Sequence, residues 1–215
     1  MDELTLSQQA ASLSADVFSN SDSFQKLFNI GKMFAASTLV PQAYQGNPMD
    51  CTIAVDMANR MGVSPMMVMQ NLYVVKGKPS WSGQACMSMI KASPEFRDVH
   101  HIYFGDKGTD GRGCYVTATR VKDNERVDGP EVTIKMAKEE GWYSKKDKYG
   151  NETSKWQTMP ENMLAYRAAA FFARIHIPNA LMGCHVEGEV YDAAKEEVPS
   201  ISDPFFPPEG EERFK

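Results

Sequence analysis

The sequence has no long apolar run and no paired cysteine motif. No stretch of about 18 apolar residues, the length that a membrane-spanning helix needs, occurs in it. The opening MDELTLSQQ lacks the basic and apolar regions of a signal peptide. The cysteines at positions 51, 86, 114 and 184 are far apart and form no C-x-x-C. We therefore expect a reduced, cytoplasmic chain with no membrane partner.

Common catalytic motifs are missing as well. The KGKPS segment at 76–80 lacks the spacing of a Walker A phosphate loop, and the glycines at 105, 108 and 111 precede no expected helix. His100 and His101 are neighbours on an expected strand, so they point to opposite faces and do not share one metal. Cys184–His185 has no second pair at metal-binding spacing. The sequence thus favours binding over bond-making catalysis, without ATP or another cofactor.

Negative charge is concentrated at one end of the chain. The net charge is −5, but residues 187–215 contain nine acids and three bases. Residues 1–186 contain 19 acids and 20 bases and are close to neutral. The segment 193–215 is rich in Glu, Pro and Ser without packing periodicity, which predicts a disordered acidic tail.

The order of expected elements indicates an α+β fold. Helical patterns occupy the first 40 residues and 49–69, and a short strand pair flanks the turn at 76–79. A helix at 84–91 and a hairpin of 96–104 with 114–121 follow. We expect a small, hairpin-based antiparallel sheet packed on a long helix, in a single domain of residues 1–192. The N-terminal helices within 1–40 are candidates for contacts between subunits.

The long helix is expected within Trp156–Arg174. Thr158 and Glu161 have the spacing of a capping box, and Pro160 falls in the first turn. Arg167 and Arg174 are two turns apart on one side, roughly 10.5 Å from each other. One face of the helix is an apolar stripe of Leu164, Ala168, Phe171, Phe172 and Ile175. A second face, which another backbone could approach closely, consists of the small residues Ala165, Ala169 and Ala173.

Two basic segments are interleaved with aromatic residues, which is typical of proteins that bind single-stranded nucleic acid. The first segment precedes the long helix and contains Lys145, Lys146, Lys148, Lys155, Trp142, Tyr143, Tyr149 and Trp156. The second contains Lys76, Lys78 and Trp81. A solvated loop and an ordinary hairpin turn remain the alternatives, because acids such as Asp147 and Glu152 dilute the first segment.

Several blocks, in order, resemble the phage RecT and lambda Red beta single-strand annealing proteins over roughly residues 30–192. They are Ala58–Asn59 with Gly62 and Pro65, NLYVVKGKPSWSGQ at 71–84, and the EGW at 140–142. The W-x-x-x-P-x-x-M-L-x-x-R-A pattern at 156–168, the Ala173–Arg174 pair and an acidic segment at 187–192 follow.

The resemblance implies an ATP-independent, phage-encoded protein that coats single-stranded DNA in the bacterial cytoplasm and pairs it with a complementary strand. It implies homo-oligomeric rings or helical filaments, and cooperation with a phage 5′→3′ exonuclease and the host single-strand-binding protein. Any assistance of annealing by Mg²⁺ would need no dedicated site.

Individual residues carry over as DNA-contacting candidates. Arg167 and Arg174 match basic positions of the family's helix, and Trp156 matches the helix entry. The lysine turn at 76–78 matches a segment near the DNA backbone. One departure is clear, because Glu161 and Asn162 stand where the lambda-type protein has a basic pair.

Two alternatives remain at this point. One is an oligomeric protein-interaction module whose lysines are merely solvated. The other is a metal-dependent nuclease that uses Glu187, Glu189 and Asp192, although an acidic helix start is the more ordinary interpretation of these residues.

Overall fold

A computed structural model of the protein describes residues 20–75 and 77–186, and its fold is α+β, as the sequence predicts. The N-terminal half contains α2 (Ser21–Ala35), η1 (Gln42–Tyr44), α3 (Pro48–Met61), α4 (Pro65–Asn71), β1 (Leu72–Val75), β2 (Lys78–Trp81) and α5 (Gly83–Ala92). The C-terminal half contains β3 (Phe96–Phe104), β4 (Gly113–Arg120), β5 (Arg126–Asp128), β6 (Val132–Thr133), α6 (Ile134–Glu139), α7 (Lys155–Thr158), α8 (Pro160–His176), η2 (Pro178–Leu181) and β7 (His185–Val186).

The strands form two small sheets. The expected hairpin is the centre of the larger sheet, in which β3, β4 and β5 are neighbours in that order and β6 also pairs with β4, all antiparallel. The smaller sheet has the order β1–β2–β7. Its β1–β2 pair is antiparallel, whereas its β2–β7 pair is parallel. The chain returns to β2 only after the long crossover through α8, which leaves the two strands running in the same direction.

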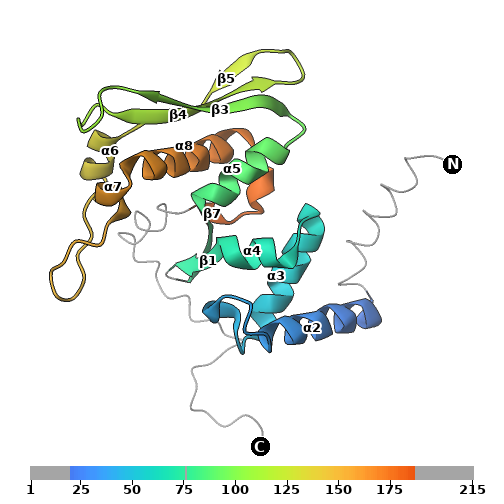
Figure 1. Ribbon diagram of the computed structural model, residues 1–215. Helices are drawn as coiled ribbons and strands as arrows, with labels where there is room; N and C mark the ends of the chain where they lie inside the picture. The colour runs from blue at the N-terminus through green and yellow to red at the C-terminus, as the bar shows by residue number, and fades with distance from the viewer. Residues whose placement is uncertain (1–19, 76, 187–215) are drawn as a thin grey trace, which may run out of the picture.

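Helix α8 lies under the larger sheet and packs against α5, while α2, α3 and α4 form a separate group of helices beyond β1 (Figure 1). The alanines of α8, 0–7% exposed, are Ala165, Ala168, Ala169, Ala170 and Ala173. This chain's own sheet and helices therefore cover the small-residue face that the sequence shows.

One detail of the predicted helices is wrong. Helix α8 begins at Pro160 after Met159 with no side-chain cap, and Thr158 ends the separate short helix α7, so there is no capping box. In α3, Ile53 is 58% exposed, whereas Cys51, Ala54 and Ala58 are at most 1% exposed. Neighbouring α2 covers the side of α3 that carries the small residues, because Gly31 of α2 approaches the backbone of Thr52 closely.

Buried side chains from α2 to β7 form one continuous core. All four cysteines are free and buried. None of the described helices is long and apolar enough to cross a membrane. Residues 1–19 of the expected N-terminal helices, Lys76 and the acidic tail at 193–215 lie outside the described residues.

The approach of α5 to α8 yields a stability prediction. A Cβ added to Gly83 would lie 2.5 Å from the Cβ of Tyr166 and 2.6 Å from its backbone oxygen. Gly83→Ala should therefore destabilise the fold by about 1–3 kcal/mol, measured by urea unfolding. Gly111→Ala is the matched control, because its new Cβ would meet only the Thr109 hydroxyl, at 3.9 Å. Equal stability of the two variants would contradict this packing.

Candidate nucleic-acid interface

A pocket of about 370 Å³ opens between the start of α5, the middle of α8 and the loop 142–155, hereafter the lysine loop. This loop projects away from the sheet and joins α6 to α7 (Figure 1). We call the cavity the aromatic pocket. Its lining comprises Gly83, Glu140, Gly141, Trp142, Ser144, Lys145, Thr153, Ser154, Lys155, Trp156, Met163, Tyr166 and Arg167.

A stacked arginine–tryptophan pair forms one wall of the aromatic pocket. The guanidinium carbon of Arg167 lies 3.8 Å from the ring centroid of Trp142. Trp142 also contacts Trp156, with ring centroids 5.9 Å apart, and Phe171, at 6.4 Å. A cation over a desolvated indole contributes about 2 kcal/mol. Arg167 is only 7% exposed, so its most direct role in the fold is to hold Trp142 and the base of the lysine loop against α8.

Acidic side chains organise the lysine loop from within. Glu152 accepts hydrogen bonds from the Ser144 hydroxyl (2.6 Å) and the Lys145 amide (2.7 Å). These bonds, with a further one from the Ser154 amide, lower the pKa of Glu152 to about 2. Asp147 accepts from the amides of Tyr149 and Asn151 and closes the turn at the tip. The two acids that dilute the charge of this segment are therefore also what shapes it.

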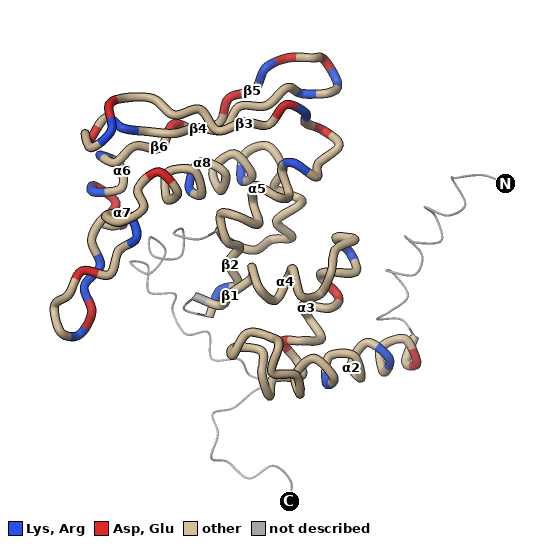
Figure 2. The backbone as a smooth tube through the Cα atoms, in the orientation of Figure 1, with Lys and Arg blue, Asp and Glu red and all other residues tan. Residues whose placement is uncertain are grey.

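The lysines of the loop occupy two positions relative to the pocket. Lys145 and Lys155 are exposed and line the pocket itself. Lys146 and Lys148 are exposed farther along the loop, and the Lys148 ammonium lies 4.9 Å from the ring centroid of Tyr149. Basic and acidic positions alternate along this projecting segment (Figure 2). A ligand that reaches the pocket thus meets positive charge on its way in.

The other predicted contacts are dispersed. Trp156 is 4% exposed and Trp81 is fully buried, with its indole N–H donating to the Leu181 carbonyl at 3.1 Å, so neither ring offers an open face to a base. Lys78 is half-buried on β2, a strand that contributes nothing to the aromatic pocket, and Lys76 lies outside the described residues.

Arg174, near the end of α8, donates to the Cys184 carbonyl at 3.3 Å. Arg167 and Arg174 therefore contact different neighbours along one side of the helix.

Sequence reasoning missed Tyr166 and Gly83 as parts of this site. Tyr166 lies next to Arg167 in α8, lines the aromatic pocket and accepts a hydrogen bond from Gln84 at 2.7 Å. Its signal in the sequence is a lone polar aromatic residue inside a run of alanines. Gly83 joins the pocket only because α5 crosses α8 at that point, a long-range contact that no local pattern carries.

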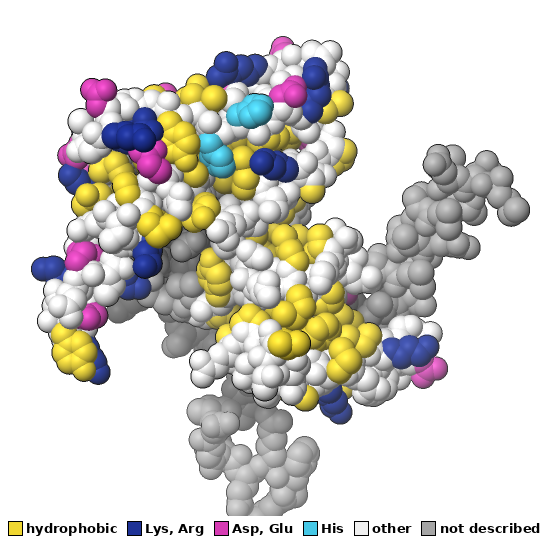
Figure 3. Space-filling view, viewed as in Figure 1, with side chains coloured by type: hydrophobic (Ala, Val, Ile, Leu, Met, Phe, Trp, Pro, Cys, Tyr) yellow, Lys and Arg dark blue, Asp and Glu magenta, His cyan; other side chains and the backbone are white. Residues whose placement is uncertain are grey.

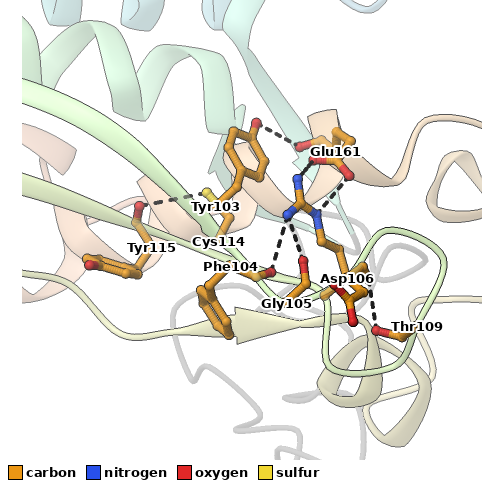
Figure 4. A network of polar contacts seen from close by, with 9 residues as sticks. Tyr103, Phe104, Gly105, Asp106, Thr109, Cys114, Tyr115 and Glu161 are labelled. Atoms are coloured by element: carbon orange, nitrogen blue, oxygen red, sulfur yellow. Dashed lines mark hydrogen bonds and ion pairs between the residues drawn. The ribbon is translucent and has the colours of Figure 1, made fainter.

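Glu161, the residue that departs from the annealing family, has a partner within the fold (Figure 4). Its carboxylate accepts from Nε of Arg112 at 2.9 Å and from Nη2 of Arg112 at 2.7 Å. Arg112 precedes β4 and also donates to the Gly105 carbonyl, while the Tyr103 hydroxyl donates to the Glu161 carbonyl. This ion pair fastens the first turn of α8 to the hairpin, so an acid at this position has a structural purpose independent of any nucleic acid.

No group of three or more His, Cys, Asp and Glu that could hold a metal occurs within residues 20–75 and 77–186. Glu187, Glu189 and Asp192, the candidate nuclease carboxylates, lie outside the described residues. A comparison with protein-family models and with curated proteins finds no match to this chain. The resemblance to the annealing family therefore rests on the motifs in the sequence.

The Arg112–Glu161 ion pair makes a prediction about pH. Hydrogen bonding from Arg112 lowers the pKa of Glu161, so the pair stabilises the fold above the usual pKa of glutamate, about 4.3. That stability is lost as the pH falls through the lower pKa of the folded protein. Glu161→Gln should thus reduce Tm at neutral pH, and the difference from the unsubstituted protein should shrink below about pH 4.

Thermal unfolding followed by circular dichroism from neutral to acidic pH measures the effect. Glu131→Gln is the control. Glu131 is exposed, and this substitution removes the same charge from a position outside the network. A Tm deficit of Glu161→Gln that stayed constant down to acidic pH would show that charge pairing is not its cause.

Proposed function

We propose that this protein binds single-stranded DNA and anneals it to a complementary strand without ATP, as RecT and Red beta proteins do. The observation that supports this most directly is the aromatic pocket, where Lys145 and Lys155 stand at the edge of a cavity walled by Trp142 and Tyr166. Cations beside aromatic faces suit an unpaired strand, because every phosphate is anionic and every base has a stacking face. The ordered motifs in the sequence add the link to annealing.

In this proposal the lysine loop and the aromatic pocket contact different parts of the strand. Lysines of the loop attract the phosphates and release counterions, which provides affinity that does not depend on sequence. The pocket accepts an unstacked base, and stacking on an aromatic side chain contributes about 1–3 kcal/mol per base. Neighbouring bases remain outside the pocket and free to pair with an incoming strand. No bond is made or broken in this process, so neither a nucleotide cofactor nor a bound metal is required.

Assembly completes the proposal. One protomer provides only a short binding surface, so rings or filaments of copies would extend it along the strand. A phage 5′→3′ exonuclease that produces single strands, and the host single-strand-binding protein that coats them, are the proposed partners. The setting is the cytoplasm of the bacterial host.

Annealing itself is the first test. Complementary labelled oligonucleotides should anneal faster with the purified protein than without it, in buffer free of ATP. Fluorescence energy transfer between the two strands reports the rate. If the protein leaves the rate unchanged at concentrations that coat the strands, the proposed function is wrong.

Two lysines of the pocket should set the salt dependence of strand binding. Lys145→Ala with Lys155→Ala should weaken binding to an unlabelled poly-dT oligonucleotide and reduce the slope of log K against log salt by about 1.4, since each lost contact removes about 0.7 on a single strand. Fluorescence anisotropy of a competing labelled strand measures both quantities. The matched control is Lys91→Ala with Lys122→Ala, which removes two exposed lysines away from the pocket. Equal slopes for the two double variants would remove the aromatic pocket from the interface.

One observation favours the second candidate function, an oligomeric protein-interaction module. Hydrophobic side chains gather on the surface over α2, α3 and α4 (Figure 3). Between residues 33 and 53, four large hydrophobic side chains are 58–82% exposed: Met33, Leu39, Met49 and Ile53. A module of this kind would self-associate but would bind no DNA strand even at low salt. Light scattering and strand binding on one preparation therefore separate the two functions.

A further inference from the structure

A second, mostly apolar pocket lies between α3 and the hairpin of β1 and β2. Its volume is about 220 Å³, and we call it the hairpin pocket. Its lining comprises Ala43, Tyr44, Asp50, Ile53, Ala54, Met57, Leu72, Tyr73, Val74, Pro79 and Cys184. An apolar cavity of about 150 Å³ is enough to hold benzene, so the hairpin pocket has room for a phenol ring.

The lining of the hairpin pocket carries a negative charge. Asp50 is the one formally charged side chain among its lining residues, and it lies in the first turn of α3. The Asn47 amide holds its carboxylate in place at 2.6 Å. Burial, and next the charge of Asp50, raise the pKa of Tyr44 in the pocket wall to about 12. At the rim, Ile53 and Val74 are 58% and 63% exposed, so the apolar lining continues out to the surface.

An exposed aromatic residue of matching character projects at the tip of the lysine loop. Tyr149 is 76% exposed although the turn beneath it is well ordered by Asp147. The ammonium of Lys148 lies against its ring, at 4.9 Å from the centroid. The end of this loop presents hydrophobic and basic atoms together, well away from the rest of the surface (Figure 3). A rigid ring held out with a cation beside it is suited to an apolar pocket with an acidic edge.

We propose that Tyr149 of one copy docks in the hairpin pocket of a second copy, with Lys148 directed toward Asp50. Donor and acceptor surfaces are different parts of the chain, so the contact is head-to-tail. A bound pair keeps one unused tip and one unused pocket, at opposite ends, and a contact of this kind generates a ring if it closes and a filament if it does not. The inferred contact provides a surface for the assembly that the proposed function needs, and its biological purpose rests on that function. The contact itself involves no nucleic acid.

The test uses two variants that each remove one half of the contact. Tyr149→Ala removes the ring from an exposed tip, and Ile53→Lys places a cation at the exposed rim of the pocket. Neither side chain is part of the core, so both variants should fold. Matched controls are Tyr149→Phe, which keeps the ring, and Met49→Lys, which places the same charge at an apolar, 61% exposed site that does not line the pocket.

Sedimentation velocity of the full chain without DNA gives the readout. The unsubstituted protein and both controls should form oligomers whose size increases with protein concentration. Their self-association should be weaker at high salt. Each of the two variants alone should weaken self-association by about 30-fold or more, as expected for a central aromatic contact. Mixed in equal amounts, they should form a heterodimer and nothing larger, because one supplies only a pocket and the other only a tip.

Several results would overturn the inference. They are a monomeric unsubstituted protein, single variants that assemble normally, or a mixture that stays monomeric. If Tyr149→Ala lowers strand binding but leaves assembly unchanged, the ring contacts bases instead of a second copy, and the proposed function stands without this contact. If the unsubstituted protein assembles through this contact but does not speed the annealing of complementary strands, the proposed function is contradicted and the inference stays in place.

Discussion

The close contact of α8 with the larger sheet on one side and with α5 on the other is the constraint on which the rest of the structure depends. Alanines 0–7% exposed let the helix approach its neighbours, and Gly83 lets α5 reach the backbone of Tyr166. Larger side chains would separate these layers, since cores are packed nearly as densely as crystals. The Arg112–Glu161 ion pair then fixes the start of α8 against the hairpin. With that helix in place, the positions of its outward residues are determined.

The candidate interface follows from this arrangement. Arg167 of α8 stacks on Trp142, which holds the base of the lysine loop. Lys145 and Lys155 then stand at the edge of one pocket, and Tyr149 projects at the far end of the same loop. A single loop can thus serve a strand at its base and a neighbouring copy at its tip. The two proposals assign these ends of the loop to different contacts, so they can be tested separately.

Much of the fold could be predicted because local signals and tertiary packing agree. Gly62 ends α3 in the left-handed conformation, as its position after the helical pattern indicates. The alternating segments on either side of the glycine-rich turn pair as β3 and β4. The capping box does not form, because Thr158 ends α7 and α8 begins after Met159, while the Glu161 carboxylate pairs with Arg112, 49 residues away in sequence. The 58% exposure of Ile53 could not be read from the sequence, because it depends on how α2 packs against α3.

The sequence by itself determined the order of the elements, the long alanine-rich helix and the concentration of lysines and aromatic rings before it. These depend on periodicity, turn residues and composition, which act over a few residues. Only the tertiary structure decided the surroundings of each aromatic ring. Trp81 is fully buried, Trp156 and Tyr166 line the pocket with Trp156 only 4% exposed, and Tyr149 is exposed at the tip. The reason is physical, because the exposure of a ring depends on which distant segments pack around it, and no local pattern records those contacts.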